Sequence, residues 1–183
     1  MKEQLDLNSI LKAGKLTSAL DYERALVLDK KLRLLAKEDA HWGEARQKLR
    51  GILKNYEQIH WSKTAQINAA QISESDAAER IAEQERLFLE KRKSAIKQKM
   101  VQFGLNQQEL GKILGHGKTY TSELVNGLSP FSMRDLVVLN QLFGIPFSEL
   151  IPAILSITDR AKIKNSIAAL NKPGLSAEMA AFS

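Results

Sequence analysis

Residues 105–151, LNQQELGKILGHGKTYTSELVNGLSPFSMRDLVVLNQLFGIPFSELI, decide the fold of this chain. Apolar residues return every three to four positions within short segments of this stretch, which is the spacing of amphipathic helices. Glycines separate the segments, each standing where a left-handed residue would end a helix: Gly104, Gly115, Gly127 and Gly144. The pattern therefore predicts short helices over residues 107–114, 118–126 and 132–143, followed by a final turn at 148–151.

The first two of these helices are joined by only three or four residues, with Gly115 at the bend. Asn106 can cap the first helix, and Leu110, Ile113 and Leu114 are predicted to bury one of its faces. Helices of about two turns joined so tightly cross at a steep angle, which exposes the start of the second helix. The second helix is expected to turn three residues inward, namely Thr121, Leu124 and Val125. It is expected to expose Lys118, Thr119, Tyr120, Ser122 and Glu123, and a helix with short polar side chains fits the DNA major groove.

The same stretch resembles the helix-turn-helix domains of the Xre and lambda-repressor-like family. The shared landmarks are Gln107, Leu110, Gly115, Ser122, Asn126-Gly127, Leu136, Leu139 and Gly144-Ile145-Pro146. The resemblance implies that Asn106 and Gln107 contact DNA phosphates and that Asn126 contacts the DNA backbone from a loop. It also implies that Lys118, Thr119 and Glu123 face base edges. Amide donors at a helix N-terminus suit phosphate, and a lysine can donate to guanine O6 or N7.

Three features depart from that family's pattern. Thr121 stands where a larger aliphatic residue is usual, Gly117 replaces a Ser or Thr cap, and the loop after Gly127 lacks the usual Lys or Arg. Residues 101–151 carry three Lys or Arg against four Asp or Glu, a net charge of −1. We expect the preceding helix to supply the missing positive charge from its cluster of Lys91, Arg92, Lys93, Lys97 and Lys99, with Lys93 and Lys97 as auxiliary phosphate contacts. The alternative is a solvated helix face paired with Glu83, Glu85 and Glu90.

The rest of the chain also favours helices, so the predicted fold class is all-α. A helical hairpin is expected from a helix beginning near Thr17 or Ser18 and a second helix whose apolar positions run from Trp42 to Ile59. The polar stretch 61–75 is expected to connect this hairpin to a long helix over 76–103, capped by Ser75. One more helix is expected from Thr158, ended by Asn171 and Pro173. The predicted division is 1–75 for a partner-binding or dimerisation region, 76–152 for the DNA-binding domain and 153–183 for a C-terminal helix with a mobile tail.

The wider resemblance is to HigA-like antitoxins of bacterial toxin-antitoxin pairs. Similar motifs are Tyr-Glu-Arg-Ala-Leu at 22–26, Asn-Tyr-Glu at 55–57 and the Gly-Leu-Asn-Gln-Gln-Glu-Leu, Ser-Glu-Leu-Val-Asn-Gly and Phe-Gly-Ile-Pro segments downstream. The resemblance implies a homodimer that represses its own operon and binds a small basic RelE/HigB-like toxin that cleaves messenger RNA. Tyr22 and Trp61 are the candidate partner contacts. The alternatives are a stand-alone or phage-type repressor without a toxin and an interaction module that does not bind DNA.

Composition excludes several other classes of protein. The 183 residues include no cysteine, which removes disulfides, thiolate metal sites and cysteine nucleophiles. His41, His60 and His116 lack metal-ligand spacing, and no catalytic constellation, cofactor motif or phosphate loop is evident, so we expect neither an enzyme nor a metal site. No signal segment or membrane span is evident, and a cytoplasmic location is expected. The net charge of +6 favours an anionic partner, here double-stranded DNA with an inverted-repeat operator.

Overall fold

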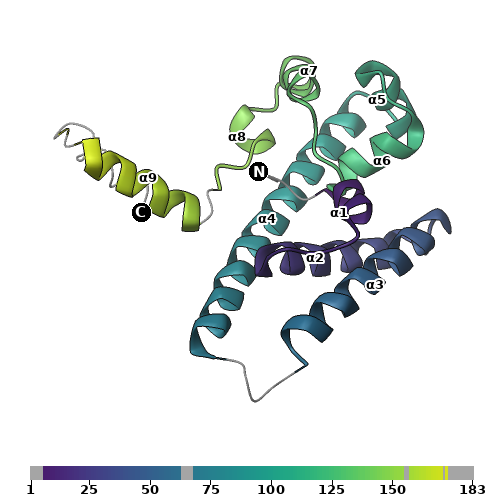
Figure 1. Cartoon of the computed structure of the whole chain (residues 1–183). Coiled ribbons are helices and arrows are strands. Elements are labelled where there is room, and N and C mark those ends of the chain that lie inside the picture. The colour runs from purple at the N-terminus through teal and green to yellow at the C-terminus, as the bar shows by residue number, and fades with distance from the viewer. Residues whose placement is uncertain (1–5, 63–67, 155–156, 171, 173–183) are drawn as a thin grey trace. The chain divides into compact units, whose positions relative to one another are not determined.

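The computed structural model describes residues 6–62, 68–154, 157–170 and 172, and this part of the chain contains helices and no strand (Figure 1). The predicted all-α fold is therefore confirmed. The helices are α1 (Leu7–Ala13), α2 (Ala19–Leu35), α3 (His41–His60), α4 (Ala69–Gln102), α5 (Gln107–Leu114), α6 (Lys118–Asn126), α7 (Met133–Phe143), α8 (Phe147–Leu150) and α9 (Ile157–Leu170). None of the described helices is long and apolar enough to cross a membrane.

The chain divides into two compact units, Met1–Pro152 and Ala153–Ser183. The first unit spans both the N-terminal region and the DNA-binding region that the sequence analysis separated at residue 75. The second unit contains α9, which matches the predicted C-terminal helix. Asn171 and Pro173, the residues expected to end that helix, lie outside the described residues.

Helices α2 and α3 form the predicted hairpin, and the sequence did not reveal the short helix α1 before them. The Ser18 hydroxyl caps α2 by accepting the Asp21 N–H at 3.1 Å, as expected. Asp6 caps α1 and Gly14, at φ 65°, ends it. These seven helical residues are too short a window for a periodic signal to stand out. At the end of α3, Ile59 was predicted to face inward, but it is 77% exposed.

Helix α4 begins seven residues earlier than predicted. Asn68 rather than Ser75 caps it, accepting the Gln71 N–H at 2.9 Å. The first two turns are rich in alanine and polar helix formers with little apolar content, so intrinsic propensity extends the helix where the hydrophobic pattern predicted a linker. At its other end, Phe103 is 52% exposed and stacks on Phe143 with ring centroids 5.7 Å apart.

Two hydrophobic cores occupy the first unit, and α4 borders both. The first core joins α1, α2 and α3, and the second joins the C-terminal half of α4 to α5, α6, α7 and α8. Leu89 of α4 packs on the first core, whereas Ile96 and Met100 belong to the second. The α2–α4 contact also holds a buried ion pair, in which Arg24 Nε donates to Glu85 Oε2 at 2.8 Å. Leu128 follows α6 in the chain but is fully buried in the first core.

The tight crossing of α5 and α6 explains why Thr121 replaces a larger residue. Thr121 is fully buried, and its hydroxyl donates to the Gly117 carbonyl at 2.9 Å. It faces Gly111 of α5, where an added Cβ would lie 2.6 Å from Thr121 Oγ1 and 2.9 Å from the His116 carbonyl oxygen. A small residue on each helix therefore allows the close approach of the two helices.

We predict that Gly111→Ala lowers the free energy of unfolding by about 1–3 kcal/mol, because the backbone oxygen of His116 cannot yield as a flexible side chain would. Gly51→Ala in α3 is the matched control, since nothing lies within 4 Å of its added Cβ. That substitution should raise stability by about 0.5–1 kcal/mol through helix propensity. Urea unfolding of both variants checks the pair, and equal shifts would contradict the close α5–α6 approach.

Candidate nucleic-acid interface

The first turn of α6 is open to solvent, as predicted. Lys118, Thr119 and Tyr120 are exposed, and Ser122 is half-buried. No side chain caps this helix, because its N-cap residue is Gly117. The N–H groups of the first turn and the partial positive charge of the helix N-terminus are therefore available to an anionic or hydrogen-bond-accepting ligand.

The N-terminus of α5 presents amide side chains. Asn106 and Glu109 form a capping box, in which the Glu109 N–H donates to Asn106 Oδ1 at 3.0 Å and the Asn106 N–H donates to Glu109 Oε2 at 2.8 Å. Within the part of the chain that the structure describes, the Nδ2 group of Asn106 has no partner. Asn106 is exposed and Gln107 half-buried, so both side chains can reach a phosphate at this helix end.

The expectation that Glu123 is exposed is wrong. Its side chain is buried, with 9% of the residue exposed, and Oε2 accepts the Asn8 Nδ2 group at 2.8 Å and the Ser129 hydroxyl at 2.9 Å. The reason is the packing of α1 against this side of α6, which no local pattern in the sequence indicates. Glu123 is therefore not available to contact a base edge in this structure.

Asn126 lies at the end of α6 and is half-buried. Its Nδ2 group donates to the Ser122 carbonyl at 2.9 Å and to the Ser122 hydroxyl at 3.2 Å. Its own carbonyl accepts Lys31 Nζ from α2 at 3.1 Å. The side-chain donors that we expected to contact the DNA backbone thus bond to α6 itself.

The turn between α5 and α6 is fixed to the start of α7. His116 Nε2 lies 3.0 Å from Asp135 Oδ1, and an Arg134 guanidinium nitrogen donates to the Leu114 carbonyl at 2.7 Å. Burial acts to raise the pKa of Asp135, but hydrogen bonds from Ser132 and His116 outweigh it and hold that pKa below its ordinary value. The charged carboxylate therefore anchors the turn that sets the direction of α6.

The cationic cluster of α4 is only partly exposed. Lys97 is exposed and Lys93 half-buried, which leaves both available to a phosphate. Arg92, counted in that cluster, is instead 3% exposed, and burial lowers its pKa to about 10. Its guanidinium donates to the Leu150 carbonyl at 3.2 Å and lies 5.1 Å from the Phe131 ring centroid. Arg92 therefore ties α4 to the end of α8 and is not a phosphate contact.

The three histidines have local partners and do not converge. His41 packs edge-on against Trp42, His60 stacks on Tyr56 with centroids 4.1 Å apart, and His116 pairs with Asp135. Among the described residues, no group of three or more His, Asp or Glu side chains could hold a metal ion.

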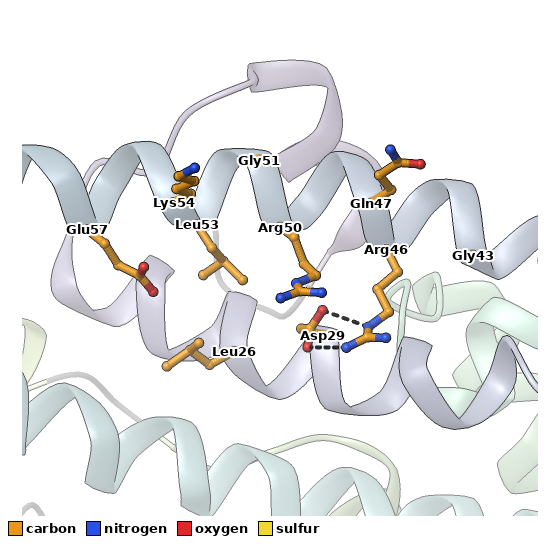
Figure 2. Close-up of a pocket in the computed structure, with 10 residues that line it drawn as sticks. All are labelled: Leu26, Asp29, Gly43, Arg46, Gln47, Arg50, Gly51, Leu53, Lys54 and Glu57. Atoms are coloured by element: carbon orange, nitrogen blue, oxygen red, sulfur yellow. Dashed lines mark hydrogen bonds and ion pairs between the residues drawn. The ribbon is translucent and has the colours of Figure 1, made fainter.

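A second candidate site lies on the hairpin, where α2 and α3 border a hollow of about 680 Å³ (Figure 2). Arg46 of α3 forms a two-bond ion pair with Asp29 of α2, with nitrogen–oxygen distances of 2.9 and 3.2 Å. Arg50 and Lys54 continue the same side of α3 without an ion-pair partner among the described residues. The hollow is lined by Leu26, Asp29, Gly43, Arg46, Gln47, Arg50, Gly51, Leu53, Lys54 and Glu57. We call it the hairpin groove, and no motif in the sequence singled it out.

The two expected partner contacts are largely engaged within the chain. Tyr22 stacks on Tyr56 with centroids 4.9 Å apart and donates its hydroxyl to Glu57 at 2.9 Å, and burial raises its pKa. Trp61 packs against the first core, and its buried Nε1 has no acceptor among the described residues. Tyr22 lies beside the groove-lining Glu57, whereas Trp61 is not one of the groove residues.

Comparison with known proteins identifies the C-terminal part of the first unit. Residues 96–150, less than a third of the chain, match the family model described as helix-turn-helix. No curated protein and no solved structure matches the chain significantly. The match covers the end of α4 and all of α5 to α8, the segment whose helices expose the first turn of α6. Residues 96–150 are thus similar to helix-turn-helix domains, in agreement with the resemblance seen in the sequence.

Proposed function

We propose that this protein is a transcriptional repressor that inserts the first turn of α6 into the DNA major groove. The observation that carries the proposal is the open, uncapped N-terminal turn of α6, with Lys118, Thr119 and Tyr120 exposed. Lys118 is proposed to donate to guanine, and the Thr119 methyl group to contact a thymine methyl group. Tyr120 and Ser122 lie on the same turns and complete the proposed base-facing set.

The phosphate contacts proposed beside this helix come from α5 and α4. Asn106 and Gln107 present amide donors at the α5 N-terminus. Asn126 stays a proposed contact only through the main-chain groups around it, because its side-chain amide donates to Ser122. Lys93 and Lys97 add positive charge from α4. This charge offsets the net charge of −1 carried by residues 101–151.

We predict that Lys118→Ala weakens sequence-specific binding by about 1–3 kcal/mol, because it removes a base contact. Lys93→Ala should instead weaken binding to every sequence and reduce the slope of log affinity against log salt by about one. Titrations of a selected duplex and a random duplex at several salt concentrations separate the two effects. Lys48→Ala, at an exposed position of α3, is the control. Equal losses for Lys118→Ala on both duplexes would contradict its base-reading role.

The repressor is proposed to act as a homodimer on an inverted repeat. Four apolar side chains at the ends of α4 and α7 and the start of α8 are exposed and available for a contact between subunits: Val101, Phe103, Leu142 and Phe147. A two-fold symmetric dimer presents two copies of α6 to two half-sites.

Footprinting on the DNA upstream of the gene should show two symmetric protected half-sites, with centres roughly 10 base pairs or a multiple apart. Phe103→Lys should convert the protein to a monomer and weaken protection of both half-sites together. A single unrepeated site, protected equally by the wild-type chain and Phe103→Lys, would overturn the dimeric arrangement.

We further propose that the repressor is an antitoxin that regulates its own operon, with α1–α3 binding a small basic RelE-like toxin that cleaves messenger RNA. The support is the hairpin groove, in which Arg50 and Lys54 lack ion-pair partners among the described residues. They can pair with individual carboxylates at the contact surface of the toxin, whose net positive charge lies elsewhere. Tyr22 borders this groove through its bond to Glu57. A stand-alone repressor is the second candidate, and it is favoured by the packing of Leu128 into the first core, which gives α1–α3 a role without any toxin.

Purification of the tagged full chain from its native host at moderate salt tests the choice. A toxin partner should appear as a stoichiometric small basic protein, retained by Lys48→Glu and lost by Arg50→Glu. Both positions are exposed on α3, and only Arg50 lines the hairpin groove. Recovery of the chain alone, still able to shift its upstream DNA, would overturn the antitoxin proposal and leave the stand-alone repressor.

A further inference from the structure

The C-terminal end of the recognition helix α6 is held by residues from the N-terminal region. Leu128, two residues beyond the helix, is fully buried among side chains of α1, α2 and α3. Its carbonyl accepts the Leu7 N–H at 2.8 Å, which joins the backbone of α1 to the loop after α6. The end of α6 therefore cannot shift without disturbing the first core.

Asn8 of α1 holds one side chain of α6. Its Nδ2 group donates to Glu123 Oε2 at 2.8 Å, and the Ser129 hydroxyl donates to the same oxygen at 2.9 Å. A buried carboxylate needs such donors because its desolvation is costly. Removing Asn8 would leave Glu123 with one of these two donors, which favours a movement of α6 that brings the carboxylate towards water.

Lys31 of α2 holds the last backbone carbonyl of α6. Its Nζ donates to the Asn126 oxygen at 3.1 Å and lies 3.4 Å from Glu90 Oε1 of α4. Burial lowers the pKa of Lys31, and Glu90 counters that effect. A cation at a helix C-terminus also complements the partial negative charge there.

The turn that follows fits closely around these groups. Gly127 adopts φ 67°, and an added Cβ would lie 3.3 Å from both Lys31 Nζ and Leu89 Cδ1. Helices α1, α2 and α4 thus each contact the end of α6, while its opposite end carries the exposed residues proposed to read DNA.

We propose that Asn8 and Lys31 are specificity-determining positioning residues, which act on DNA reading through α6 without contacting DNA. The inference rests on the proposed DNA-binding function. Base contacts depend on side-chain placement within a fraction of an ångström, whereas phosphate attraction depends mainly on charge. Loosening the far end of α6 therefore reduces discrimination between sequences and leaves the salt-dependent attraction to any DNA in place.

The test uses a duplex selected from a random library by the wild-type full chain, with a random-sequence duplex as the non-specific ligand. Asn8→Ala and Lys31→Met should each lower the ratio of specific to non-specific affinity about five- to tenfold, a fraction of the discrimination that base contacts supply. The controls are Asn55→Ala and Lys48→Met, identical changes at exposed positions of α3 without a described contact. The controls should keep the wild-type ratio, and Lys31→Met should match Lys48→Met in salt slope.

Further variants separate positioning from loss of fold. Asn8→Asp has nearly the same shape but places a second carboxylate against Glu123, so it should lower the ratio of specific to non-specific affinity as Asn8→Ala does. An unchanged circular-dichroism spectrum shows that the Asn8→Asp variant is folded. Lys31→Arg keeps a cationic donor for the Asn126 carbonyl and should retain most of the wild-type ratio of specific to non-specific affinity. In a double-mutant cycle, Asn8→Ala and Glu123→Gln should be non-additive, because the first removes the Asn8–Glu123 hydrogen bond and the second removes the acceptor charge that strengthens it.

Two outcomes separate this inference from the proposed function. A wild-type chain that selects no sequence from the library overturns DNA reading and the positioning role together. A wild-type chain that selects a sequence, with folded Asn8→Asp and Lys31→Met variants that keep the wild-type ratio, overturns the positioning role alone.

Discussion

Leu128 is the residue on which the arrangement of this molecule depends most. It belongs to the helix-turn-helix segment in the sequence and to the core of α1–α3 in the packing. Withdrawing a fully buried leucine from a core costs about 1.5–3 kcal/mol from transfer alone. That cost opposes any movement of α6 away from the N-terminal region, so we expect the two parts to open and close together.

Helix α4 connects the N-terminal region to the helix-turn-helix segment, because it packs against both hydrophobic cores. The Arg24–Glu85 ion pair fixes its N-terminal half to α2, and Arg92 fixes its C-terminal half to the end of α8. A buried charge must be paired or hydrogen-bonded to be tolerated, so each of these contacts also determines how α4 lies on its neighbours. The helix-turn-helix domain thus presents α6 from a support that the N-terminal helices share.

The sequence predicted the elements that depend on local signals. The hairpin, α5–α8 and the left-handed glycines at 115, 127 and 144 follow from apolar spacing and capping, and so does the exposed first turn of α6. The failures at the candidate site concern contacts between residues far apart in the chain. Glu123 and Arg92 looked like solvated charges, but partners 115 and 58 residues away enclose them. The spacing of apolar residues in the sequence does not reveal partners so far apart in the chain. It also does not reveal that Leu128 packs among the helices α1–α3 of the N-terminal region.

Native-state hydrogen exchange tests most directly whether α1–α3 and α6 form one cooperative unit. The measurement compares the amides of Leu28 in α2 and Leu53 in α3 with those of Leu124 and Val125 in α6, all of which are buried. The account predicts that the four amides share one opening free energy and one denaturant dependence. Opening of Leu28 and Leu53 at a lower free energy, with Leu124 and Val125 still protected, would contradict it.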